Sequence, residues 1–142
     1  MPQKKNRPVA TNRSLSRREQ KDLDVTIGFL EGIVRRDPGY VDALQLLGDD
    51  YTRRGRLLDG LEVDERLSRL CPGDPLVHYN LACSYTLNGS IEDALAALDQ
   101  AIKLGYRDFK WMARDPDLKK LREHPAYKDL EARVRQIKVK LR

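Results

Sequence analysis

Apolar residues recur at spacings of three and four along most of the chain, which is the period of helices that bury one face. Turn signals built from Gly, Pro, Asp and Ser separate these runs. Aromatic residues make up only 6% of the chain and β-branched runs are scarce, so a large sheet is not expected. The pattern predicts an all-α fold whose first five helices cover about 16–37, 41–54, 57–70, 75–88 and 90–104.

Residues with capping preferences mark the ends of these helices. Ser16 with Glu19 three residues on has the form of a capping box, and Ser90 is expected to cap its helix in the same way. Asp74 and Pro75 supply an N-cap and a first-turn proline. Glycines able to adopt the left-handed conformation follow three of the helices, namely Gly55, Gly89 and Gly105.

The apolar stripes identify the expected core. The inward side of the third helix is expected to carry Leu58, Leu61 and Leu67. Further on, Asp108 and Asp115 are each expected to cap a short helix. Pro125 then begins a final helix, whose inward seam is predicted to be Leu130, Val134, Ile137 and Leu141.

One sequence element occurs twice. The stretch LGDDYTRRG at 47–55 recurs as LACSYTLNG at 81–89, which is 34 residues later. The unit that repeats is a pair of helices joined by a short turn. Such a pair cannot bury its apolar face alone, whereas stacked pairs share a continuous core. The interval therefore predicts a short solenoid of helix pairs.

At this interval the chain resembles the tetratricopeptide repeat (TPR) family, over about residues 20–106. Counted from Val41, the family's apolar, small, Tyr and Pro positions are met by Leu44, Leu47, Gly48, Tyr51, Gly60, Leu67 and Pro72. Counted from Pro75, the same positions hold His78, Leu81, Ala82, Tyr85, Ala94, Leu98 and Ala101. Asp64 departs from the family's large apolar residue and is expected to loosen local packing. The resemblance implies a short right-handed TPR α-solenoid with helical caps.

The resemblance also implies a division of the chain. A single TPR domain is expected over 16–142, and it would contain a half-repeat capping helix (16–37), two full units (41–74 and 75–108) and C-terminal capping helices (109–142). The stretch GYRDFKWMARDPDLKKLREHPAYKDL is similar to the closing segment of many bacterial TPR proteins. Residues 1–15 have no periodic apolar face and are predicted to form a disordered basic arm.

The net charge of +5 is unevenly distributed. Residues 1–18 carry six Lys or Arg and no acid, and residues 128–142 carry six against two acids. Such ends can bind RNA, ribosomes or another polyanion in a salt-dependent way, which is the alternative function of a basic-armed accessory factor. Because no aromatic residues for base stacking are interleaved with these charges, we favour a solubilising role for them.

Catalytic and metal-binding patterns are not found in the sequence. His78 and His124 are isolated, and Cys71 and Cys83 lie in no ligand spacing, so neither an enzyme nor a cofactor is expected. No run approaches the roughly 18 apolar residues of a membrane span. A cytoplasmic protein is the expectation, monomeric or weakly self-associating through its last helix.

The function expected from the resemblance is protein binding. In TPR proteins the first helix of each pair lines a concave groove that holds a peptide or helix, so the chain would be an adaptor or scaffold. The groove positions implied for this chain are Asp42, Gln45, Asp49, Thr52, Arg53, Tyr79, Asn80, Cys83, Thr86, Lys110 and Arg114.

One subtype of the family clamps a C-terminal carboxylate of a chaperone. Asn80, Lys110 and Arg114 stand at matching positions, but Gln45 and Asp49 replace the required Lys and Asn. Since Asp49 would repel a carboxylate, that ligand is not favoured.

Overall fold

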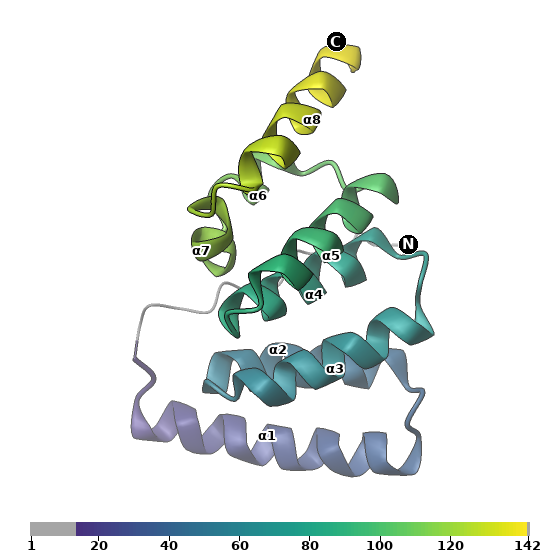
Figure 1. The fold of residues 1–142 in the computed structure, drawn as a ribbon. Helices are drawn as coiled ribbons and strands as arrows, with labels where there is room; N and C mark the ends of the chain where they lie inside the picture. Colours follow the sequence, from purple (N-terminus) through teal and green to yellow (C-terminus); the bar gives the residue numbers. More distant parts are fainter. Residues whose placement is uncertain (1–13, 142) are drawn as a thin grey trace.

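The computed structural model describes residues 14–141, and all regular structure within this range is helical. Each of the first four helices packs against the next one in chain order, and α3 and α5 lie in front of α2 and α4 in the view of Figure 1. The structure confirms the expected all-α fold, a short helical solenoid. Its elements are α1 (Arg17–Arg36), α2 (Val41–Arg54), α3 (Leu57–Leu70), α4 (Pro75–Leu87), α5 (Ile91–Lys103), α6 (Phe109–Met112), the 3-10 helix η1 (Pro116–Leu118), α7 (Lys119–Arg122) and α8 (Tyr127–Lys140).

Most of the expected helix ends are confirmed. The Ser16 side chain accepts a hydrogen bond from the Glu19 amide at 3.1 Å, and Asp74 accepts one from the Leu76 amide at 3.0 Å. Three glycines adopt positive φ angles just beyond α2, α4 and α5, at Gly55, Gly89 and Gly105. The expected arm over 1–15 lies almost wholly outside the described residues.

The cap expected at Ser90 is wrong. Within the described chain its side chain makes no capping hydrogen bond. The Ser90 amide instead closes the preceding turn by donating to the carbonyl of Tyr85 at 2.9 Å. This bond ties the backbone of Ser90 to the end of α4, and the first amides of α5 receive no hydrogen bond from the Ser90 side chain.

Two expected core residues are exposed. Leu58 is 75% exposed, because α3 turns Gly60, Val63, Asp64 and Leu67 inward instead. Leu141 is 68% exposed. The reason is visible in Figure 1, where the end of α8 extends away from the stack.

The core falls into two clusters of buried side chains. One joins α1, α2 and α3 and takes in Val77 from the start of α4. The other joins α4, α5 and everything that follows, including Leu98, Leu118 and Leu121, none of which has measurable exposure. The two clusters meet at α3 and α4, where the Ser84 hydroxyl donates to the buried carboxylate of Asp64. The loosened packing expected at Asp64 is therefore not seen.

The segment expected as capping helices has the layout of a third helix pair. Residues 109–122 follow α4 at the 34-residue interval, but they form α6, η1 and α7 instead of one helix. Pro116 has no amide hydrogen to donate, and Asp115 caps the new start by accepting from the Asp117 amide at 3.0 Å. At the break the Arg122 guanidinium donates to two carbonyls, those of Met112 at 3.0 Å and Asp115 at 2.7 Å; the Asp115 carbonyl also accepts from the Leu118 amide at 3.0 Å.

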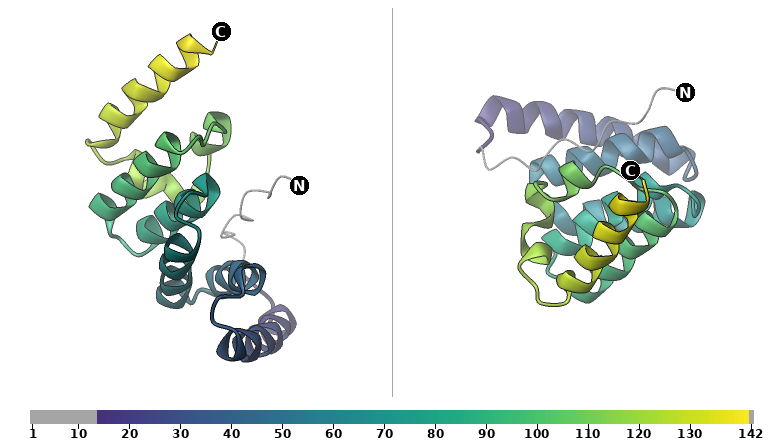
Figure 2. Two further views of the ribbon diagram at one scale, coloured as in Figure 1. Left: turned by 90° about the vertical axis from the view of Figure 1, so that its right-hand side faces the viewer. Right: turned by 90° about the horizontal axis from the view of Figure 1, so that it is seen from above.

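The final helix α8 completes this third pair. Tyr127, Leu130 and Val134 bury its first half against the C-terminal core, and Arg133 pairs with Asp99 of α5 at 2.5 Å. The left view of Figure 2 shows α8 at one end of the stack. In the described part of the chain, no helix has both the length and the apolar content needed to cross a bilayer.

Candidate protein-binding surface

Four of the groove positions implied by the family resemblance are buried. Thr52, Tyr79, Cys83 and Thr86 are each at most 5% exposed, so the expectation that they face a ligand is wrong in this structure. The two threonines turn back onto their own helices. Thr52 donates to the carbonyl of Gly48 at 3.0 Å and Thr86 to that of Ala82 at 2.8 Å.

Tyr79 and Cys83 are covered by the segment that follows α5. The Tyr79 ring stacks on Tyr106 with centroids 4.3 Å apart and an interplanar angle of 9°. Its hydroxyl donates to Asp115 at 2.7 Å, and the Cys83 thiol reaches the same carboxylate oxygen at 3.7 Å. Burial, followed by the charges of Cys83 and Asp115, raises the pKa of Tyr79 far above its ordinary value. The chain's own third pair thus occupies this face of α4.

What remains accessible lies mainly on α2. Asp42 and Arg53 are exposed, and Gln45 and Asp49 are partly buried. Leu46, which the sequence analysis missed, is 58% exposed. Because these positions are three or four residues apart, they follow one side of the helix. We call this set the α2 strip: Asp42, Gln45, Leu46, Asp49 and Arg53.

Asn80 of α4 is at the repeat position that corresponds to one residue of the α2 strip. It follows Leu46 by 34 residues, so the two occupy equivalent places in successive helix pairs. Asn80 is partly buried, yet its side-chain carbonyl oxygen is shielded and has no hydrogen-bond partner among the described residues. A buried acceptor without a donor costs about 1 to 3 kcal/mol. A ligand N–H or O–H group would remove that cost once the Asn80 side chain turned outward to meet it.

The α2 strip is acidic on balance. Asp42 and Asp49 lie within it, and Asp50 lies beside it. Arg53 is the nearest cation in sequence and stands 3.9 Å from Asp50. Burial raises the pKa of Asp50, and the Arg53 guanidinium opposes that shift. An exposed leucine among carboxylates favours a ligand with an apolar anchor and positive charge or hydrogen-bond donors.

Lys110 and Arg114 lie elsewhere. Lys110 belongs to α6 and borders a hollow together with Lys138 and Leu141 of the last helical segment. Arg114 follows α6, and its guanidinium lies 5.9 Å from the centroid of the Trp111 ring. The break at Asp115–Pro116 has therefore taken Arg114 out of the helix that would present it in a regular repeat.

One group of buried side chains has the spacing of metal ligands. Within residues 14–141, ligand atoms of Cys83, Asp115 and Asp117 lie within 4.8 Å of one another. Asp115 already accepts hydrogen bonds from the Tyr79 hydroxyl, the Cys83 thiol and the Asp117 amide. Helix capping and core packing account for these contacts. We therefore assign these three side chains a structural role and propose no metal site.

No family model matches the chain. A stretch of 92 residues, 63% of the chain, is 35% identical to a chloroplastic protein of Arabidopsis thaliana. A stretch of 96 residues, 68% of the chain, is 34% identical to the human PEX5-related protein. A third stretch, of 90 residues and 62% of the chain, is 34% identical to the peroxisomal targeting signal receptor of Komagataella phaffii.

The similarity covers a minor part of each relative. The matched stretch corresponds to 27% of the Arabidopsis protein, 15% of the human protein and 16% of the yeast receptor. What these proteins share with the chain is thus a region of 90 to 96 residues.

Proposed function

We propose that the chain is a non-enzymatic, cytoplasmic protein-interaction module of TPR type that binds a short peptide or helix of another protein. The ligand would lie along the α2 strip and reach Asn80. The observation that carries this proposal is Leu46, which is 58% exposed on a helix whose neighbouring positions are acidic. Single exposed leucines are common on protein surfaces, but Leu46 is also in register with Asn80, whose side-chain oxygen has no hydrogen-bond partner among the described residues.

The comparisons support a protein-interaction module at a coarse level. One relative is named as a receptor for a peroxisomal targeting signal. The stacked helix pairs of the present chain provide an extended surface of the kind that helical-repeat proteins use for binding. The third pair covers Tyr79 and Cys83, so the proposed site is shorter than a groove built from two complete repeats.

The chemistry of the strip restricts the ligand. Leu46 would contact an apolar anchor, and Asp42 and Asp49 would pair with Lys, Arg or backbone amides of the ligand. The side-chain oxygen of Asn80, which has no hydrogen-bond partner among the described residues, would accept a hydrogen bond after the side chain turned toward the ligand. A ligand whose main feature is a carboxylate would be repelled by Asp49, so chaperone tails are not proposed.

The test is affinity capture from nuclease-treated lysate of the source organism, with retained proteins identified by mass spectrometry. Wild type is compared with the double variant Leu46→Asp, Asn80→Ala and with the matched control Leu58→Asp. Leu58 is also exposed, at 75%, but it lies on α3. A partner retained by wild type and the control and lost with the double variant supports the proposal.

Two results would contradict it. If the double variant retains the same proteins as wild type, the α2 strip is not the site. If capture survives only without nuclease and is lost on deleting residues 1–13 or adding salt, the alternative of a basic-armed factor bound to RNA or ribosomes takes its place. Circular dichroism of every variant excludes unfolding as the cause.

A further inference from the structure

The end of the molecule around α8 has a charge opposite to the rest. Residues 106–141 contain 11 Lys or Arg and 6 Asp or Glu, whereas residues 14–105 contain 11 and 16. Two of the six acids, Asp115 and Asp117, are buried. Asp108 is exposed and accepts from the Trp111 amide as the N-cap of α6. The accessible surface of this end is therefore strongly cationic.

Two adjoining hollows lie between α6 and α8. One, of about 290 Å³, is lined by Phe109, Met112, Tyr127 and Val134 together with Arg122, Arg135 and Lys138. The other, of about 470 Å³, shares Phe109 and Lys138 and adds Arg107, Lys110 and Leu141. We call the two together the α6–α8 cleft. Its floor is apolar, and its ionisable border has five cations and the two acids Asp108 and Glu131.

The cations on the border fall into two groups. Arg107 donates to the carbonyls of Ile102 and Tyr106, and Arg122 donates to those of Met112 and Asp115, so both are held in place. Lys110, Arg135 and Lys138 have no ion-pair partner within residues 14–141. The held arginines shape the cleft, and the three other cations are available for an incoming anion.

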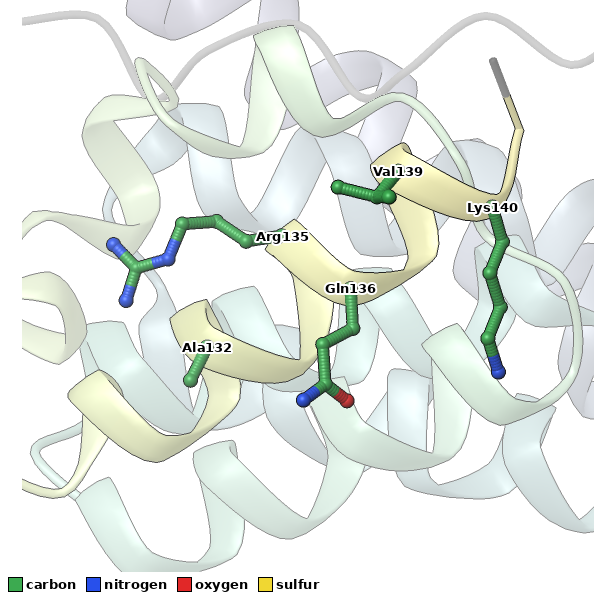
Figure 3. Close-up of a pocket in the computed structure, with 5 residues that line it drawn as sticks. All are labelled: Ala132, Arg135, Gln136, Val139 and Lys140. Carbon is green, nitrogen blue, oxygen red and sulfur yellow. The ribbon is translucent and has the colours of Figure 1, made fainter.

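Phe109 links the floor to the charges. The Lys138 ammonium lies 5.9 Å and the Arg107 guanidinium 6.0 Å from its ring centroid, within the range of cation–π attraction. Beyond Ile137 the outer side of α8 stays in solvent, with Val139 at 67% exposure. Figure 3 shows Ala132, Arg135, Gln136, Val139 and Lys140 projecting from this side.

We infer that the α6–α8 cleft binds an acidic, amphipathic segment of a partner protein, at a site separate from the α2 strip. Charge complementarity selects an anionic partner, and Leu141, which lines the cleft and is 68% exposed, offers a contact for an apolar anchor of that partner, as in helix-in-groove recognition. Nucleic acid fits less well. The aromatic rings in the cleft, Phe109 and Tyr127, are at most 5% exposed, so they offer no face on which bases can stack.

The test measures binding of three fluorescent probes by anisotropy at low and high salt. The first probe is a synthetic peptide of about four helical turns, with Glu on one side and Leu and Phe on the other. The second keeps its glutamates and replaces each Leu and Phe by Ser. The third is a single-stranded oligouridylate of the same charge. The inference requires the first probe to bind about tenfold more tightly than the others.

The variants locate the site. Lys110→Glu with Lys138→Glu reverses two exposed charges of the cleft and is expected to weaken binding of the first probe about tenfold. The matched control, Lys21→Glu with Arg36→Glu, reverses two exposed charges on α1 and should leave binding unchanged. Equal weakening by both pairs, or tighter binding of the oligouridylate, would overturn the inference. The Leu46→Asp, Asn80→Ala variant should bind the probe normally, which separates this site from the proposed function.

Discussion

The hydroxyl of Tyr79 donates a hydrogen bond to Asp115 at 2.7 Å, and this contact joins α4 to the start of η1. The other oxygen of the same carboxylate accepts from the Asp117 amide at 3.0 Å. Asp115 therefore both caps the second piece of a broken helix and fixes that piece to the neighbouring pair. Because Tyr79 is 1% exposed, water cannot replace either partner.

Removing this contact should destabilise the protein to a degree that depends on which partner is lost. Tyr79→Phe deletes one hydrogen bond to the carboxylate and should lower the free energy of unfolding by about 1 to 2 kcal/mol. Asp115→Ala also removes the cap of η1 and leaves the Tyr79 hydroxyl buried without an acceptor, so about 2 to 4 kcal/mol is expected. Urea unfolding followed by circular dichroism measures both values.

The exposed carboxylate of Asp129 on α8 provides the control. Asp129→Ala should change the free energy of unfolding by no more than about 0.5 kcal/mol. An Asp115→Ala variant as stable as Tyr79→Phe would mean that the cap contributes nothing.

Alkaline pH should unfold the protein through its buried tyrosines. Burial raises the pKa of Tyr79 and Tyr106 above the ordinary value of 10.0. Burial and the hydrogen bond to Glu31, at 2.6 Å, do the same for Tyr51. The folded state thus keeps these phenols protonated where the unfolded state would ionise them. Their contribution to stability is complete below pH 10 and is lost progressively as the pH rises above it.

The measurement is tyrosinate absorbance recorded alongside circular dichroism during an alkaline titration. Part of the tyrosinate signal should appear only together with loss of the helical signal. Above pH 10, Tyr79→Phe should make the free energy of unfolding less dependent on pH, because one of the ionising phenols has been removed. Ionisation of every tyrosine before any helix is lost would contradict the assignment.

The helical pairs could be predicted because local and long-range signals agree. The 34-residue interval, the caps at Ser16 and Asp74 and the glycine at residue 55 all placed α1 to α4 within a residue or two of where they lie. The predicted core residues were wrong where apolar residues lie on more than one side of the same helix. In α3, Leu58 and Val63 fit different stripes equally well, and only contact with α2 and α4 decides that Val63 is buried.

The candidate surface was harder to predict for a physical reason. The family resemblance implies groove positions for a regular third pair, but the break at Asp115–Pro116 brings a carboxylate onto Tyr79 and Cys83, and both are buried. The signal was present in the sequence as an Asp-Pro pair inside a repeat-length segment. Exposure of Leu46 leaves no such signal, because periodicity alone does not say which apolar residues lack a partner.

Asp64 and Ser84 should be energetically coupled. Ser84→Ala removes a hydroxyl that donates to a carboxylate 1% exposed, which should cost about 1 to 3 kcal/mol. Asp64→Leu alone would place an apolar side chain against the Ser84 hydroxyl. The double variant, Asp64→Leu with Ser84→Ala, restores the apolar pairing usual at this repeat position. It should be more stable than Ser84→Ala alone, because replacing both buried partners can be nearly neutral.

A double-mutant cycle by urea unfolding gives the coupling free energy directly. We expect a coupling of about 1 kcal/mol or more, since the two side chains are in contact. Strict additivity of the two substitutions would show that the Ser84 hydroxyl does not stabilise the buried carboxylate.

Two glycines in helices should respond oppositely to alanine. A Cβ on Gly60 of α3 would lie 3.0 Å from Oγ1 of Thr52 and 3.6 Å from the carbonyl oxygen of Gly48, whereas a Cβ on Gly28 of α1 meets nothing within 4 Å. Alanine gains up to about 1 kcal/mol over glycine in a helix interior. Gly28→Ala should therefore raise the free energy of unfolding.

At Gly60 the same gain is opposed by crowding between α2 and α3. The Thr52 hydroxyl cannot simply turn away, because it donates to the Gly48 carbonyl at 3.0 Å. Gly60→Ala is expected to lower the free energy of unfolding by about 1 kcal/mol or more, as overpacking does in other cores. Adding Thr52→Ala removes the crowded oxygen, so Gly60→Ala should cost less in that background. A Gly60→Ala variant as stabilised as Gly28→Ala would show that the two helices separate without cost.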